Sequence, residues 1–236
     1  MLKNIIFDLD GTLLPQDQNE FIKNYFYSLT KKLVLLGYDS EKFIKGIQIG
    51  TNAMIQNHGK ETNEKVFWDV FEEITNYKKD IISEHFMDYY INEFNELGAS
   101  VKPYNGLNEV LLNLKEKGYQ LILATNPLFP PIATQNRIKW AGIDSDVFSH
   151  ITTYDNSYYS KPNIKYYQEI FDDFEMLPDE SIMIGNDMIE DLVITELGCD
   201  IYIVTDNLIN KDNLELPEKS SNVVELINYL NKLLDK

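Results

Sequence analysis

The sequence predicts an α/β fold, a doubly wound parallel sheet that carries a second, smaller domain made only of helices. From Val101 onward, short apolar segments alternate with helical segments, which is typical of a parallel sheet with helices on both faces. Residues 15–99 show helical periodicity and no convincing alternating strand. We therefore place the α/β core in residues 1–14 and 100–236 and the helical domain in residues 15–99.

Four segments of the helical region repeat apolar residues at helical spacing: 19–36, 40–49, 64–74 and 81–97. Phe67, Trp68 and Phe71 follow this spacing, so we expect them in the helical core rather than against a ligand. His58 and Lys60 fall in a polar stretch between helices. Two interpretations of that stretch stay open: a solvated loop, or a loop that reaches down to a substrate.

The opening apolar segment, residues 4–9, must join the sheet of the α/β core, because a lone strand cannot bury its faces. The remaining strands are expected at 120–124, 147–151, 181–184 and 201–204, and the helices at 108–117, 130–140, 163–174, 190–197 and 223–234. In an open parallel sheet, ligands bind outside the carboxyl ends of the strands. Candidate functional residues are therefore sought at those ends.

Composition and charge exclude several classes of function. The net charge of −17 opposes general binding to nucleic acids or anionic membranes. No apolar run approaches the roughly 20 residues of a membrane helix, and no signal-peptide pattern precedes the first strand. Cys199 is the only cysteine, so an internal disulfide is impossible. We expect a cytoplasmic protein, either a monomer or a homodimer.

Two carboxylates, Asp8 and Asp10, follow the first strand and precede a glycine and a threonine. Residues two apart on a strand point to the same side, so both carboxylates should leave the strand together unless the chain bends. Like charges held this close repel each other unless a cation lies between them. Carboxylate oxygens are ligands that Mg²⁺ prefers, which makes this a candidate magnesium site.

Three further groups of polar residues occur at or near the ends of predicted elements. Thr125 and Asn126 directly follow a strand, where a hydroxyl and free backbone N–H groups can hold a phosphate. Lys161 precedes a predicted helix, a slightly unfavourable place for a cation. Residues 185–191, GNDMIED, place three carboxylates and an asparagine after a strand. Each group alone has an ordinary structural explanation, as a loop residue, a solvated lysine or a helix cap.

Taken together and in this order, the motifs resemble those of the haloacid dehalogenase-like (HAD) superfamily. The string FDLDGTLL at residues 7–14 is similar to its first motif, and Thr125, Lys161-Pro162 and the GNDxxxD pattern at 185–191 match the later ones. The helical insertion lies where HAD proteins with a helical cap of the first type carry theirs. The resemblance implies a Rossmann-like core with an inserted all-α cap.

The resemblance also implies roles for individual residues. Asp8 would be the nucleophile that attacks phosphorus, and Asp10 the general acid and base. Thr125, Asn126 and Lys161 would hold the phosphoryl oxygens.

Mg²⁺ is the implied cofactor, held by Asp8, by Asp10 through its backbone carbonyl, and by Asp187. Many relatives carry an acid directly after the glycine of the last motif, whereas this chain has Asn186. Asp187 is therefore the expected metal ligand, because it is the first anion after that glycine. Asn186 and Asp191 are expected to support the site from behind, Asp191 with a hydrogen bond to Lys161.

The expected function is Mg²⁺-dependent hydrolysis of a small phosphorylated metabolite through an aspartyl-phosphate, with the cap setting the choice of substrate. In this family, dehalogenases need no acid at the place of Asp10, whereas phosphatases and phosphomutases have one. A phosphomutase, another HAD-type hydrolase and a non-catalytic module that binds a phosphorylated ligand remain alternatives. Arg137 would contact a second anionic group of the substrate or form an ion pair on the surface of a helix.

Overall fold

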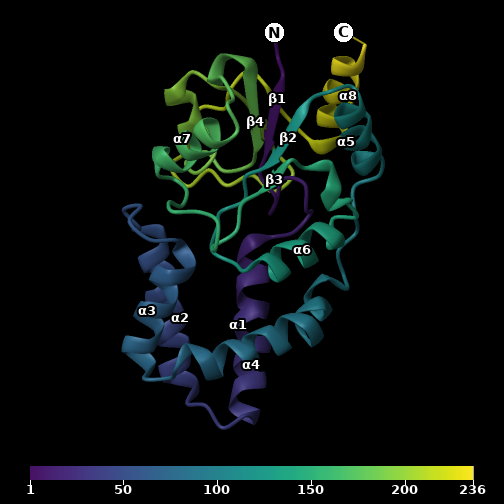
Figure 1. The fold of residues 1–236 in the computed structure, drawn as a ribbon. Coiled ribbons are helices and arrows are strands. Elements are labelled where there is room, and N and C mark those ends of the chain that lie inside the picture. Colours follow the sequence, from purple (N-terminus) through teal and green to yellow (C-terminus); the bar gives the residue numbers. More distant parts are fainter. Residues whose placement is uncertain (236) are drawn as a thin grey trace.

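The computed structural model describes residues 1–235 and contains a parallel sheet of six strands in the order β3-β2-β1-β4-β5-β6 (Figure 1). The first strand lies in the middle of the sheet and pairs with β2 on one side and β4 on the other. The strands are β1 (Asn4–Phe7), β2 (Gln120–Leu123), β3 (His150–Ile151), β4 (Ser181–Gly185), β5 (Asp200–Val204) and β6 (Ser220–Ser221). The expected doubly wound α/β core is thus confirmed.

Alternation along the strands divides the core between the two faces of the sheet. Ile5 and Phe7 join a cluster that includes residues of α5 (Leu107–Glu116) and α8 (Val223–Leu234). Ile6 points to the other face, where it meets residues of α7 (Ile164–Asp173). Figure 1 shows α5 and α8 on one side of the strands and α7 on the other. Each central strand is therefore buried on both faces, which explains its continuous apolar sequence.

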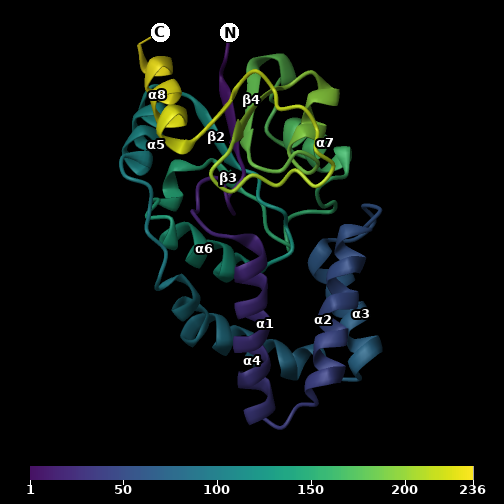
Figure 2. The same ribbon diagram turned by 180° about the vertical axis from the view of Figure 1, so that it is seen from behind.

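The inserted helices lie beyond the carboxyl ends of the strands, and both termini lie at the opposite end of the molecule (Figures 1 and 2). They are α1 (Gln18–Leu35), α2 (Ser40–Ile55), α3 (Asn63–Thr75), α4 (Lys79–Asn92) and a 3₁₀ helix, η1 (Phe94–Gly98). Side-chain caps at Asp17, Asp39 and Thr62 begin the first three. Within residues 1–235, no helix has the length and apolarity that a membrane crossing requires.

These helices enclose an apolar cluster of their own, rich in aromatic rings that include the expected core residues Phe67, Trp68 and Phe71. Ala133 of α6 (Pro131–Trp140) belongs to the same cluster, although α6 follows β2 and also contributes Ile138 to the core of the sheet. The helical segment is therefore continuous in packing with the α/β core. The division of the chain at residues 14 and 99 remains a prediction.

The start of α3 is bound to the α/β core by the side chain of Asn63, which is completely buried. Its Nδ2 donates to the carbonyl oxygens of Pro127 and Tyr159, at 3.3 and 3.2 Å, and to Oγ of Ser160, at 3.1 Å. Its backbone N–H donates to the carbonyl of Ser157 at 2.9 Å. One side chain thus fixes the helical region against the loop that leads to Lys161.

Several predicted elements differ from the observed ones because tertiary contacts decide their limits. The first strand ends at Phe7 rather than at residue 9, and α2 continues to Ile55. The helix expected at 81–97 is interrupted at Glu93, between α4 and η1. The helix expected at 190–197 is a 3₁₀ helix, η4 (Leu192–Leu197), and the two-residue strand β6 was not predicted.

The close packing of α2 on α3 depends on glycine. A Cβ at Gly46 would lie 2.4 Å from Cγ2 of Thr75 and 3.0 Å from the ring of Phe71. Thr75 cannot rotate freely, because its hydroxyl donates to the Phe71 carbonyl at 2.7 Å and accepts from Tyr77 N–H at 3.1 Å. Any larger residue at position 46 must therefore separate the two helices.

We expect Gly46→Val to lower the free energy of unfolding by about 1–3 kcal/mol, the usual cost of overpacking. Lys45→Val is the matched control, because Lys45 is exposed on the same helix and receives the same side chain. Thermal unfolding followed by circular dichroism measures both variants. Equal melting temperatures would show that α2 and α3 are not packed as closely as described.

Candidate active site

Asp8 directly follows β1 and is held by the loop that comes after it. Its backbone N–H continues the sheet by donating to the Ile184 carbonyl at 2.9 Å. Gly11 turns the chain with a φ of +82°, a conformation that favours glycine, and a Cβ there would lie 2.2 Å from the Asn186 amide. The turn brings Thr12 back, so that its hydroxyl lies 3.0 Å from Oδ2 of Asp8.

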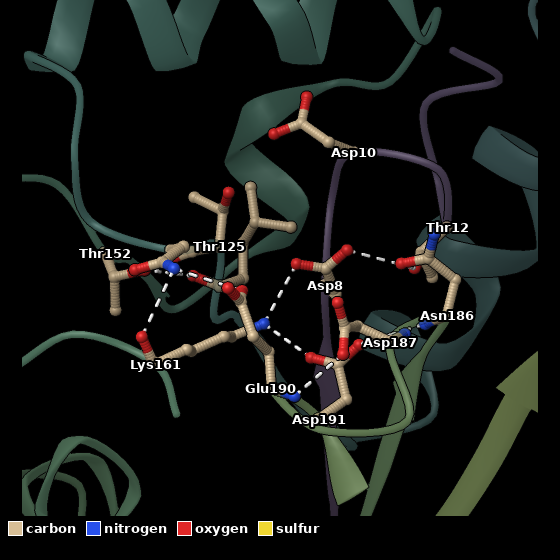
Figure 3. A network of polar contacts seen from close by, with 12 residues as sticks. Asp8, Asp10, Thr12, Thr125, Thr152, Lys161, Asn186, Asp187, Glu190 and Asp191 are labelled. Carbon is tan, nitrogen blue, oxygen red and sulfur yellow. Dashed lines mark hydrogen bonds and ion pairs between the residues drawn. The ribbon is translucent and has the colours of Figure 1, made fainter. Parts of the chain in front are cut away.

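Asp10 does not leave the strand in the direction of Asp8, because the strand ends at Phe7 and the chain bends. Figure 3 shows the carboxylate of Asp10 pointing away from that of Asp8. It forms an ion pair with Arg137 of α6, whose side chain is buried. The expectation that the two carboxylates point the same way is therefore wrong, and Arg137 is not on the helix surface.

Lys161 lies between two carboxylates from different strand ends (Figure 3). Its ammonium nitrogen is 2.9 Å from Oδ1 of Asp8 and 2.6 Å from Oδ1 of Asp191, and only 1% of its side chain is exposed. A buried ammonium is costly unless it is paired, so these two contacts determine where Lys161 can lie. The hydrogen bond expected between Lys161 and Asp191 is present.

Asp191 also organises the turn after β4. Its Oδ2 accepts hydrogen bonds from the backbone N–H groups of Asn186 and Asp187, both at 3.0 Å. Gly185 makes room for it, because a Cβ there would lie 2.2 Å from Oδ2 of Asp191. The motif therefore uses its last acid to fix both the lysine and the loop that carries Asn186 and Asp187.

Asn186 and Asp187 face Asp8 from this turn. Oδ1 of Asn186 accepts a hydrogen bond from the Thr12 hydroxyl at 3.2 Å, which connects the first and last motifs. Oδ1 of Asp187 caps the turn by accepting from the backbone N–H groups of Ile189 and Glu190 at 2.7 and 2.9 Å. Asp187 thus holds its own loop while it lines the same cavity as Asp8.

Thr125 and Asn126 approach from the end of β2. The backbone carbonyl of Thr125 is fixed by the hydroxyls of Thr152, at 2.6 Å, and Tyr166, at 2.9 Å. The Asn126 amide nitrogen donates to Oε2 of Glu190 at 3.0 Å. Both residues line the cavity beside Asp8.

The electrostatics of the site are dominated by carboxylates in a buried place. Burial raises the pKa of Asp8 to about 7. The ammonium of Lys161 opposes this shift, whereas the negative charges of Asp191 and Asp10 add to it. Burial likewise raises the pKa of Glu190 to about 7. Burial alone would lower the pKa of Lys161, but Asp191 and Asp8 together hold it well above its usual value.

The arrangement fits a small hard cation. A cavity of about 20 Å³ is lined by Asp8, Asp10, Asn186, Asp187, Glu190 and Asp191, among others, so anionic oxygens surround a space little larger than one water. In residues 1–235, no three His, Cys, Asp or Glu side chains form a metal-binding group. Coordination as predicted, by two carboxylates and a backbone carbonyl, does not require such a group.

Sequence reasoning gave no supporting role to Thr12 or Glu190, and it did not predict that Arg137 is buried against Asp10. The sequence does indicate the contact of Thr12, because a turn at Gly11 can bring a hydroxyl four residues after Asp8 back toward the Asp8 carboxylate. The pairing of Arg137 has no such signal in the sequence, because it depends on how α6 packs. His58 and Lys60 are exposed, as a solvated loop requires.

Comparison with known families settles the class of protein. The family of haloacid dehalogenase-like hydrolases matches residues 5–196 of the chain. The chain belongs to this family. The match spans every motif described above, from Asp8 to Asp191, and makes this HAD-like hydrolase an enzyme by class.

Individual relatives agree with that assignment over nearly the whole HAD-like chain. A curated glyceraldehyde 3-phosphate phosphatase from Methanothermobacter thermautotrophicus is 24% identical, covering 99% of this chain and all of the relative. Two solved structures share the fold. A 2-haloacid dehalogenase from Pseudomonas syringae has a TM-score of 0.67 at 15% identity, with 99% and 100% of the two chains covered. A HAD phosphatase from Thermococcus onnurineus has 0.57 at 18% identity, with 97% and 98% covered.

We expect Asp191→Asn to destabilise the protein by about 3–5 kcal/mol, because it leaves the buried Lys161 with one carboxylate partner. Asp200→Asn is the control: it breaks the exposed ion pair with Lys219 and should cost less than about 1 kcal/mol. Urea unfolding measures both. A loss in Asp191→Asn no greater than in the control would contradict the role given to this contact.

Proposed function

We propose that this hydrolase cleaves the phosphomonoester of a small organic molecule, with Mg²⁺ as cofactor and Asp8 as nucleophile. The observation that carries the proposal is the position of Lys161 between Asp8 and Asp191, two of the carboxylates that line the cavity together with Asp10 and Asp187. A fixed positive charge next to a nucleophilic carboxylate suits a phosphoryl group. The curated relative that acts as a phosphatase supports the same chemistry.

In the first step, an oxygen of Asp8 forms a bond to phosphorus and the bond from phosphorus to the ester oxygen breaks. Asp10, which must take up a proton before this step, gives it to the departing oxygen, which leaves as an alcohol. Since its carboxylate is bound to Arg137 of α6 in the structure, the leaving oxygen would meet Asp10 on the side of α6. Thr125, Asn126 and Lys161 hold the oxygens of the phosphoryl group.

In the second step, Asp10 removes a proton from water, and the water oxygen bonds to phosphorus. The bond between phosphorus and Asp8 breaks, which releases inorganic phosphate and restores the carboxylate. Asp8, Asp187 and the backbone carbonyl of Asp10 would hold the Mg²⁺. The ion supplies positive charge that lets an anionic nucleophile approach an anionic substrate.

The pairing of Asp10 favours a phosphatase over a dehalogenase, which shares the fold. Halide leaves a carbon atom without needing a proton, so a dehalogenase has no use for a second acid at this place. Here that acid is kept and is paired with the chain's only arginine, Arg137. Transfer of a phosphoryl group to water needs an acid for the leaving oxygen and a base for the water, and Asp10 would serve as both.

The first test is the release of inorganic phosphate from a set of small phosphorylated metabolites, with Mg²⁺ and with EDTA. We expect release with Mg²⁺, loss of it in EDTA, and restoration on adding the metal back. Asp8→Asn should lower turnover by roughly 10⁴-fold or more, because it removes the nucleophile. The control Asp200→Asn, an exposed position at the start of β5 and thus at the opposite end of the strands from the site, should retain activity.

Normal turnover in Asp8→Asn would refute the mechanism. If the wild-type protein binds phosphorylated compounds without hydrolysing any, it is a binding module instead. Conversion of one phosphate ester into an isomer, without free phosphate, would identify a phosphomutase.

A second test concerns Asp10. We expect Asp10→Asn to slow the hydrolysis of alkyl phosphates by about 10²–10⁴-fold, the usual range for general acid catalysis. Hydrolysis of p-nitrophenyl phosphate should be slowed less, because p-nitrophenolate leaves without a proton. Steady-state rates on the two substrates measure the difference, and equal losses would contradict the role of Asp10 as an acid.

A further inference from the structure

We propose that the organic group of the substrate is apolar and binds in a cavity enclosed by α1–α4. This inference rests on the proposed hydrolysis of a phosphomonoester. It adds the chemical class of the alcohol that is released, which neither the family nor the motifs specify.

The cavity around Asp8 cannot hold the organic group. Its volume of about 20 Å³ is close to the space that one water needs. Its carboxylates are suited to a cation, and a phosphoryl group alone would more than fill the space. The rest of the substrate must extend into a neighbouring space.

A much larger cavity lies among the inserted helices. Its volume is about 510 Å³, which is within the roughly 300–1,000 Å³ of pockets that bind small molecules. Eight aromatic residues contribute to its wall: Tyr25, Phe26, Phe67, Trp68, Phe86, Tyr90, Phe129 and Tyr154. The charged residues of the wall, Glu64 and Lys79, are bound to each other at 3.0 Å. A neutral apolar group is therefore the occupant that this wall favours.

The two cavities adjoin along two segments of the chain. Gln18 lines the cavity of Asp8 and Ile22 lines the larger one, and these residues are four apart on α1, or roughly 6 Å along its axis. Asn126 likewise lines the smaller cavity, while Leu128 and Phe129 line the larger one. The two cavities thus have walls built from the same two segments, and in the proposed complex one ligand of modest length spans both.

The position of Asp10 gives the direction of the leaving group. Asp10 must face the ester oxygen, and its carboxylate is turned toward Arg137 on α6. The guanidinium of Arg137 in turn lies over the ring of Phe129, with 4.6 Å from its central carbon to the ring centre. The ester oxygen therefore lies on the side of Phe129, and the organic group attached to it extends toward the aromatic wall.

A second neighbouring cavity is polar and provides the alternative. Its volume is about 390 Å³, it shares Gln18, Asn186 and Ile209 with the cavity of Asp8, and it includes the carboxylates of Asp17 and Asp206. It would suit a hydroxylated organic group. We favour the apolar cavity because the carboxylate of Asp10 points toward Arg137 on α6 and not toward Asn186.

The test compares n-alkyl phosphates from ethyl to hexyl, which share one kind of leaving oxygen and differ only in apolar length. We expect kcat/KM to rise about fourfold for each methylene that becomes buried. Glycerol 3-phosphate, the hydroxylated counterpart of propyl phosphate, should be the poorer substrate of that pair. A flat or falling series, with glycerol 3-phosphate preferred, would overturn the inference and leave phosphatase activity intact.

Substitutions that fill the apolar cavity test whether the organic group binds there. Ser83 is half-buried on α4 and lines the apolar cavity, so Ser83→Phe places a ring inside it. We expect this variant to abolish the increase with chain length. Glu84→Phe is the matched control, because Glu84 is exposed on the same helix, and it should retain the increase. If Ser83→Phe does not fold by circular dichroism, Thr51→Phe on α2 fills the same cavity. An increase retained in the filled variant would overturn the inference.

Calorimetry with n-alkylphosphonates separates this inference from the proposed function, since binding requires no turnover. Hexylphosphonate should bind more tightly than ethylphosphonate in the wild-type protein and in Glu84→Phe, but not in the filled variant. That result without hydrolysis of any phosphate ester would leave the apolar site standing and refute the phosphatase. Equal binding of the two phosphonates would overturn the apolar site.

Discussion

The pairing of one buried ammonium group with two carboxylates is the constraint on which the site depends. Lys161 has almost no contact with solvent, so its charge is tolerable only between Asp8 and Asp191. These two acids follow β1 and β4, which are adjacent in the sheet, and the register of those strands brings them together. The fold therefore supplies the electrostatic arrangement, because parallel strands end at the same edge.

Two aspartates only two residues apart have different surroundings, and the proposed mechanism gives them different tasks. Asp8 is buried between Lys161 and Thr12, and the bend after β1 directs Asp10 toward Arg137 and the inserted helices. In the proposed mechanism, the first environment would present an oxygen of Asp8 to a phosphoryl group that Lys161 attracts. The second would place the proposed acid and base, Asp10, at the boundary between the sheet and the helices. The short loop around Gly11 is what makes both positions possible.

The sequence was sufficient for the order of the core elements and for the group of residues that meets at the sheet edge. Asp8, Thr125, Lys161 and Asp191 could be placed because each lies at or near the end of an element whose apolar pattern is clear. What it could not supply depends on packing between elements distant in the chain. The pairing of Arg137 with Asp10 requires the orientation of α6, and residues 192–197 form a 3₁₀ helix rather than the expected α-helix. The strand β6 has only two serines, too short for any pattern.

The hydrogen bonds of Asn63 bear on how a molecule enters the enzyme. A rigid rotation of α2 and α3 away from the sheet would separate the Nδ2 of this buried side chain from all three of its acceptors at once, at a cost of about 1 kcal/mol for each of its two N–H groups. It would also pull on Ser160, the neighbour of Lys161. Ile22, Ile55 and Met87 line the larger cavity and are exposed, so they form its rim. Entry past this apolar rim leaves Asn63 in place and the charged edge of the sheet undisturbed while ligands exchange.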